Sequence, residues 1–218
     1  MFQRRSGSVT RFFLQGSLPG AGDHAWVEAF RKHRFRTIED ANSEEESAGW
    51  VSHADTTGSV FPEEECLLEQ VVCVRLRMDK KKAPTRWLQI RLGAELRNAG
   101  KVSPQRKKEI KQKILDELLP RVLPSVTLID VLIRPRTKEL LLFSTGLGAC
   151  DALRKLVLTT FGAKALAADA RQTALHGKLP QELLKALDQA SPTSFAASGR
   201  AAAGATQDRR EATEEAQS

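Results

Sequence analysis

The composition of this chain is that of a globular protein with a basic surplus. Of its 218 residues, 41% are hydrophobic and 28% are charged, which is ordinary for a soluble domain that can bury a core. The net charge of +7 and the pI of about 9.5 favour an anionic partner and leave the fold open. No run approaches the roughly 18 apolar residues of a membrane helix, and Arg11 interrupts the apolar piece near the N-terminus. We therefore expect neither a membrane span nor a signal peptide.

The N-terminal part predicts a strand followed by a helix. Residues 8–15 alternate loosely between apolar and polar, as a half-buried strand does. Asp23 can cap a helix that continues to about Arg34. One apolar stripe on that helix consists of Trp26, Val27 and Phe30. A strand at residues 35–39 and an acidic loop at residues 40–47 are expected next.

A strand with two unlike faces is predicted over residues 67–78. The apolar face carries Leu68, Val72, Val74, Leu76 and Met78. The opposite face carries Cys73, Arg75 and Arg77. This period of two predicts a strand with one core face and one basic face.

Two helices are expected after the loop at residues 80–82. The first starts at Pro84, is closed by Gly100 and has its apolar positions at Trp87, Leu88, Ile90, Leu92 and Leu96. The second has Ser103 as N-cap, Pro104 in its first turn and an apolar stripe of Ile110, Ile114, Leu115 and Leu118. Tryptophan at helical spacing with leucines is typical of a core, so we expect Trp87 to be buried. The alternative is that Trp87, between Arg86 and Arg91, stacks on a nucleobase.

The rest of the ordered chain predicts a second set of strands and a helix. Residues 125–133 are nearly all apolar, as in a strand covered on both faces, and residues 140–143 read as the strand that returns. A helix then follows from Thr145 to Gly162. We therefore predict an α+β fold with a mixed or antiparallel sheet and packed helices. Residues 1–175 would form the α+β domain, residues 176–190 a possible further helix, and residues 191–218 a disordered low-complexity tail.

Positive charge is concentrated between Arg75 and Glu139. This stretch holds 18 basic and seven acidic residues, a net charge of +11 against +7 for the whole chain. The usual partner of such a field is a polyanion, although a solvated basic face is the plain alternative. The residues predicted to contact DNA phosphates are Arg75, Arg77, Lys80, Lys81, Lys82, Arg86, Arg91, Lys101, Arg106, Lys107, Lys108, Lys111 and Arg121. We expect these groups to form one continuous surface that binds without sequence preference.

No pattern in the sequence indicates catalysis, a metal or a cofactor. The four histidines have no metal-ligand spacing, and no nucleophile triad stands out. The acidic clusters at residues 44–46 and 63–65 are expected to lie in loops, where solubility explains them better than a nuclease site does. Cys66, Cys73 and Cys150 form no CxxC pair, which predicts reduced thiols in a cytoplasmic protein.

A set of short motifs in co-linear order resembles the bacterial RdgC recombination-associated proteins between about Val9 and Ala168. The motifs are Gly49-Trp50-Val51, Leu118-Leu119-Pro120-Arg121, Ile129-Asp130, Ala152-Leu153-Arg154-Lys155 and Phe161-Gly162. The resemblance implies a nucleoid-associated protein that binds DNA without sequence preference and restrains recombinase filaments. It also implies a homodimer, which in the family is a ring with a basic hole for duplex DNA.

Two departures from the family pattern affect this expectation. Low-complexity sequence stands where the family has a second half that helps to close the ring, so we expect an open dimer. Val122-Leu123 occupies a place where the family can carry an aromatic residue. Duplex DNA is the first expected ligand and single strands are the second.

Two other classes of function compete with a non-catalytic DNA-binding regulator. One is an interaction protein whose basic face docks an acidic protein partner. The other is a metal-dependent nuclease, for which the sequence offers no convincing set of ligands. The salt dependence of affinity distinguishes the first two, because only a polyelectrolyte releases condensed counterions.

Overall fold

The computed structural model describes residues 7–40 and 45–190. The described residues divide into two compact units, with the boundary after Gln172. The strands are β1 (Thr10–Gln15), β2 (Glu46–Val51), β3 (Leu67–Leu68), β4 (Val71–Lys80), β5 (Ser125–Arg134), β6 (Glu139–Leu142) and β7 (Lys164–Ala167). The helices are α1 (Ala25–Lys32), α2 (Glu63–Cys66), α3 (Thr85–Ala99), α4 (Pro104–Leu118), the 3-10 turn η1 (Leu119–Arg121), α5 (Leu147–Phe161), α6 (Ala170–His176) and α7 (Gln181–Gln189). The predicted α+β class is confirmed.

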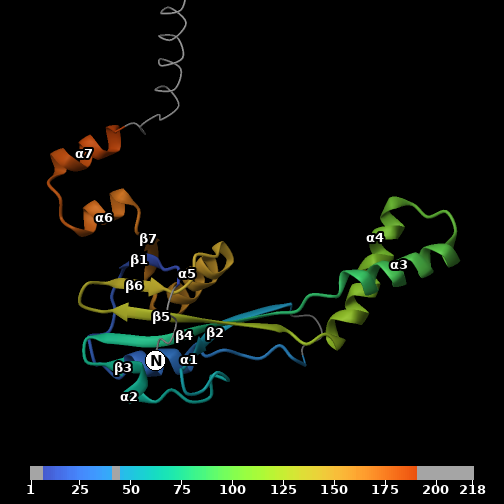
Figure 1. The fold of residues 1–218 in the computed structure, drawn as a ribbon, viewed down its shortest axis with the longest axis horizontal. Coiled ribbons are helices and arrows are strands. Elements are labelled where there is room, and N and C mark those ends of the chain that lie inside the picture. Colours follow the sequence, from blue (N-terminus) through green and yellow to red (C-terminus); the bar gives the residue numbers. More distant parts are fainter. Residues whose placement is uncertain (1–6, 41–44, 191–218) are drawn as a thin grey trace, which may run out of the picture. The chain divides into compact units, whose positions relative to one another are not determined.

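The first unit is built on an antiparallel sheet with the strand order β2-β4-β5-β6-β1-β7, and β3 adds to β4 (Figure 1). Its longest pairing joins β4 and β5, from Val72 opposite Ile133 to Lys80 opposite Ser125. Strand β1 lies between β6 and β7, so the first strand of the chain pairs only with late ones. The sheet therefore depends on contacts between distant parts of the sequence.

One face of the sheet carries the core. The apolar positions of β4 that were predicted from the period of two, Val72, Val74 and Leu76, are buried under α1 and α5. The stripe of α1 is buried as predicted, and its Phe30 ring lies 5.4 Å from the ring of Trp50. The indole Nε1 of Trp50 donates a 2.8 Å hydrogen bond to Thr160 Oγ1, which ties β2 to α5.

Several local predictions were wrong for identifiable reasons. Residues 35–39 form no strand, because this segment meets β2 through a single bridge, between Arg34 and Trp50. Its apolar side chains, Phe35 and Ile38, are nevertheless buried. Strand β5 is not covered on both faces, since its burial alternates. The β7 strand at residues 164–167 was not predicted. A positive φ of 37° at Glu69 divides the predicted strand at residues 67–78 into β3 and β4.

The acidic residues and the helix cap also differ from expectation. Glu46 belongs to β2, and residues 63–65 form most of α2 rather than a loop. Helix α1 has His24 at its N-cap position, while Asp23 Oδ1 accepts a 2.9 Å hydrogen bond from the Ala25 amide. The predicted disordered tail at residues 191–218 and part of the predicted loop at residues 40–47 lie outside the described residues.

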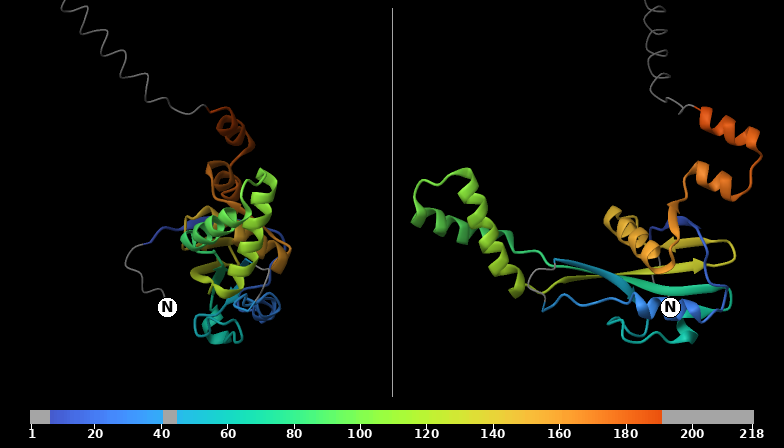
Figure 2. Two further views of the ribbon diagram at one scale, coloured as in Figure 1. Left: turned by 90° about the vertical axis from the view of Figure 1, so that its right-hand side faces the viewer. Right: turned by 180° about the vertical axis from the view of Figure 1, so that it is seen from behind.

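Residues 81–124, here called the insertion, connect two neighbouring strand ends. They leave the sheet after Lys80 and return at Ser125, and these two residues are paired across β4 and β5. Helices α3 and α4 lie side by side within the insertion (Figures 1 and 2). The Ser103 hydroxyl accepts a hydrogen bond from the Arg106 amide, which confirms the predicted cap of α4, and Gly100 ends α3 with a φ of 69°. No helix in the described part of the chain has the length and apolar character needed to cross a membrane.

Candidate nucleic-acid interface

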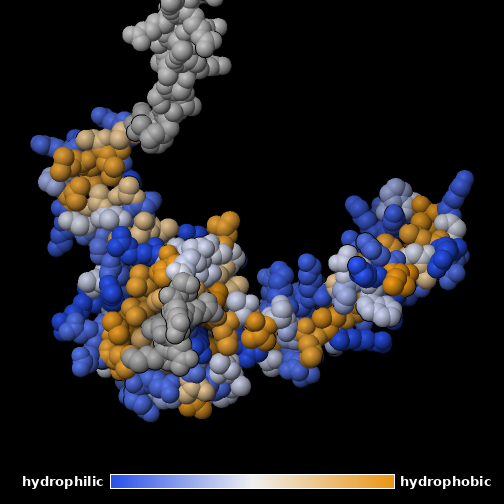
Figure 3. Space-filling view, viewed as in Figure 1, coloured by the Kyte–Doolittle hydropathy of each residue, from blue (hydrophilic) through white to orange (hydrophobic). Residues whose placement is uncertain are grey.

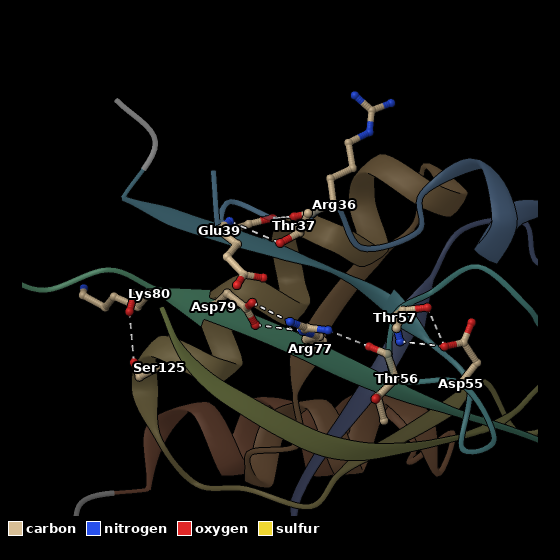
Figure 4. A network of polar contacts seen from close by, with 11 residues as sticks. Arg36, Thr37, Glu39, Asp55, Thr56, Thr57, Arg77, Asp79, Lys80 and Ser125 are labelled. Atoms are coloured by element: carbon tan, nitrogen blue, oxygen red, sulfur yellow. Dashed lines mark hydrogen bonds and ion pairs between the residues drawn. The ribbon is translucent and has the colours of Figure 1, made fainter. Parts of the chain in front are cut away.

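The two arginines predicted for the basic face of β4 are engaged inside the protein. Arg75 Nε donates a 2.6 Å hydrogen bond to Asp130 on the neighbouring strand. Arg77 forms two hydrogen bonds to Asp79, of 2.7 and 2.9 Å, and a third of 2.9 Å to the Thr56 carbonyl (Figure 4). Its guanidinium also lies 4.1 Å from the centre of the Phe35 ring. These contacts leave neither arginine free for phosphate, because their charges are already balanced and partly buried.

The hydrogen bonds from Arg77 to Asp79 have an electrostatic consequence. They raise the pKa of Arg77, so its charge is held firmly within the pair. The face that the period of two predicted to be basic is therefore locally neutral at Arg77.

The three lysines after β4 do not form the exposed group that was predicted. Lys80 makes an ion pair with Glu46 across the edge of the sheet, and this pair raises the pKa of Lys80. Lys81 is only 1% exposed, and its Nζ donates a 2.8 Å hydrogen bond to the Glu39 carbonyl. Lys82 is exposed. Replacing all three lysines together would therefore disturb the fold, because Lys81 is buried. The prediction that Arg75, Arg77 and Lys81 contact phosphates was wrong, since all three are engaged inside the protein.

The insertion carries the positive surplus of the chain. It holds twelve basic and four acidic residues, a net charge of +8. Two of its arginines are paired with acids, Arg91 with Glu117 at 3.2 Å and Arg106 with Glu109 at 2.8 Å. Exposed cations with no ion pair to another described residue are Lys82, Arg86, Arg97, Lys101, Lys107, Lys108, Lys111, Lys113 and Arg121. Seven of these nine were predicted as site residues, whereas Arg97 and Lys113 were not.

The insertion also exposes apolar side chains between its charges (Figure 3). Helix α3 contains no buried residue, and Trp87 and Ile90 are 60% and 61% exposed. The expectation that Trp87 belongs to the core was wrong, because α3 packs mainly on α4 and has no second layer to cover it. An exposed indole beside Arg86 has the chemistry of a stacking platform for a base.

A hydrogen-bonded loop supports the carbonyl that Arg77 uses. The Asp55 carboxylate accepts hydrogen bonds from Thr57 Oγ1 at 2.6 Å and from the amides of Thr57, Ser59 and Val60 at 2.7–2.8 Å. The Thr57 hydroxyl is the largest of the causes that lower the pKa of Asp55 from 3.8 to about 2. A carboxylate held in this way stabilises the loop only while it is ionised.

We expect an Asp55→Asn variant to show the pH dependence that this shift requires. Folding lowers the pKa of Asp55, so the ionised carboxylate stabilises the folded state. This stabilisation is complete at a pH above the pKa of the unfolded chain, and it is lost as the pH falls from about 4 towards 2. The free energy of unfolding of the variant should be about 1 kcal/mol lower than that of the wild type near neutral pH, and this difference should become smaller in acid. Urea unfolding at about pH 6 and about pH 3 measures both values. A gap of the same size at the two pH values would contradict this assignment.

The cysteines and the potential metal ligands of the described residues form no recognisable site. The three cysteines are free and buried, and burial raises the pKa of Cys66 to about 11, so its thiol is protonated. Within residues 7–40 and 45–190, no group of three or more His, Cys, Asp and Glu side chains could hold a metal ion. What the site offers is an array of exposed cations.

Comparison of the chain with family models and with curated proteins gave no match. The resemblance to the RdgC proteins therefore stays a prediction. Its motifs lie in β2, at the junction of α4 and η1, in β5 and in α5.

Proposed function

We propose that this protein binds nucleic acid without sequence preference, through phosphate contacts made by the insertion. The observation that carries the proposal is the set of nine exposed cations that have no ion pair to another described residue. An exposed cation that is not already neutralised can replace the counterions condensed on a polyanion. Phosphate contacts hold no base information, so affinity should vary little between sequences.

The resemblance to the RdgC proteins supports a more specific role. On that basis the protein is a cytoplasmic, nucleoid-associated homodimer that binds duplex DNA and restrains recombinase filaments during homologous recombination. It acts by occupying DNA and needs no catalytic step, metal or cofactor.

Replacing Lys107, Lys108 and Lys111 with glutamine should weaken binding to all sequences alike. For duplex DNA the plot of log affinity against log salt should become shallower by about 0.9 for each lost contact, or roughly 2–3 in total. The matched control changes Arg136, Lys138 and Lys164, which are exposed cations of the first unit outside the insertion, and so removes the same charge. Fluorescence anisotropy at several salt concentrations measures the slopes. An unchanged slope in the insertion variant, or an equal fall in the control, would contradict the proposal.

The acidic-partner alternative is supported by Trp87 and Ile90. Exposed apolar side chains flanked by Arg86 and Arg97 are also typical of a protein-binding helix. The same measurement distinguishes the two readings, because a protein partner gives a much weaker dependence on salt than DNA does. Binding to DNA that is weak and nearly independent of salt would favour the protein partner.

A further inference from the structure

A groove of about 870 Å³ lies beside the base of the insertion. It is lined by the end of α1 and the segment after it, by α5, and by the ends of β2, β4 and β5. Its lining includes Lys80 and Ser125, where the insertion leaves and rejoins the sheet. All of these parts belong to the first unit of the chain.

The charge in this groove is not balanced. Its three acids already have cationic partners: Glu46 pairs with Lys80, Asp79 with Arg77 at 2.7 Å, and Asp151 with Arg154 at 3.0 Å. Four lining cations are exposed and have no ion pair to another described residue: Lys32, Arg34, Arg36 and Lys155. The guanidinium of Arg36 points away from the Arg77–Asp79 pair (Figure 4). These four positive charges, which no described acid neutralises, are therefore available to a ligand in the groove.

We propose that this groove binds the phosphate backbone of a single strand of nucleic acid, as a second contact beside the insertion. The inference rests on the proposed function, because the insertion is what would bring the strand to the groove. A concave site suits one flexible backbone better than a duplex, which presents two backbones on a wide cylinder. The lining residues include no Phe, Trp or Tyr, so the groove lacks a large aromatic platform for bases, and we expect the contact to be made with phosphates and to be independent of sequence.

A variant of the groove tests this contact separately from the insertion. In it, Arg34, Arg36 and Lys155 become glutamine, and the ligand is a labelled oligothymidylate of roughly 15 nucleotides. The plot of log affinity against log salt should become shallower by about 0.7 for each lost single-strand contact, or roughly 2 in total. The control is again the variant of Arg136, Lys138 and Lys164. Thermal melting verifies that each variant is folded, which we expect because all the replaced side chains are exposed.

The wild-type protein offers a second readout that needs no mutation. His33 is the only histidine among the residues that line the groove. Burial and the neighbouring Lys32 lower the pKa of His33, and a bound phosphate would act in the opposite direction. We expect its imidazole resonances to shift on titration with the oligothymidylate, while those of His24, at the other end of α1 and outside the groove lining, stay in place.

The possible results separate this inference from the proposed function. If the insertion variant loses affinity while the groove variant and the His33 resonances do not change, the inference fails and the proposed function stands. Wild-type protein that binds no nucleic acid would overturn both. A His33 shift produced by polyglutamate at lower concentration than by the oligothymidylate would assign the groove to an acidic protein. Loss of slope in the groove variant together with the His33 shift supports the inference.

Discussion

Replacing Gly49 with alanine is expected to lower the free energy of unfolding by about 3 kcal/mol or more. A Cβ at this position would lie 2.4 Å from the Phe35 Cα and 2.5 Å from the Phe35 amide nitrogen. These are backbone atoms, so the neighbouring segment cannot avoid the clash by turning a side chain. It would have to move away from β2, which would break the 2.9 Å hydrogen bond from the Phe35 amide to the Trp50 carbonyl.

The matched control for Gly49 is the same substitution at Gly93. A Cβ on Gly93, in the exposed part of α3, would meet no atom within 4 Å. Alanine is there expected to stabilise the protein by about 0.5–1 kcal/mol, because it is the better helix former. Urea unfolding of both variants checks the pair of predictions. A Gly49→Ala protein as stable as the wild type would show that Phe35 does not lie so close to β2.

Removing the Asp79 carboxylate should also cost about 3 kcal/mol. Its side chain is fully buried and neutralises Arg77, which is itself only 16% exposed. An Asp79→Ala variant leaves that guanidinium with Thr56 and Phe35 but without a counter-charge. The cost comes from the unpaired buried cation more than from the lost hydrogen bonds.

Two further variants verify the cause of this loss. Glu46→Ala breaks the exposed ion pair between β2 and Lys80 of β4 and should cost much less stability than Asp79→Ala, because water screens that pair. Changing Arg77 to Met and Asp79 to Leu together removes both charges and should recover much of the stability lost in Asp79→Ala. Equal losses in Asp79→Ala and Glu46→Ala would show that burial is not the reason.

The sequence predicted the helices and the central strand well, because their signals are local. The spacing of Trp26, Val27 and Phe30 and the Ser103-Pro104 start each identify an element without knowledge of its neighbours. Strand β7 lacked such a signal, since its four residues are explained only by pairing with β1. The segment with Phe35 and Ile38 was predicted as a strand from its apolar side chains. These side chains are buried without strand pairing, by contacts with parts of the chain that are distant in sequence.

The candidate interface was predicted less well than the fold, for an electrostatic reason. Net charge along a stretch can be counted from the sequence, but the partner of each cation cannot. Arg77 and Asp79 lie two residues apart, on the same side of a strand, and that spacing was the one available hint of their pairing. Nothing in the sequence around Lys81 indicates that its side chain is buried. The unpaired cations of the groove come from residues 32–36 and from Lys155. These residues are so far apart in the sequence that counting charge along one stretch cannot show that they lie together.

Because Lys80 and Ser125 are direct neighbours in the sheet, the insertion is in effect a long loop between two adjacent strands. Expanding a short turn to such a loop costs only about 2 kcal/mol of closure entropy, so the sheet can tolerate its gain, loss or exchange. The remainder of the chain holds 22 basic and 23 acidic residues, which is 34 − 12 and 27 − 4, a net charge of −1. The basic character of this protein is therefore modular: a different insertion between the same two strands could present a different surface without any change to the core.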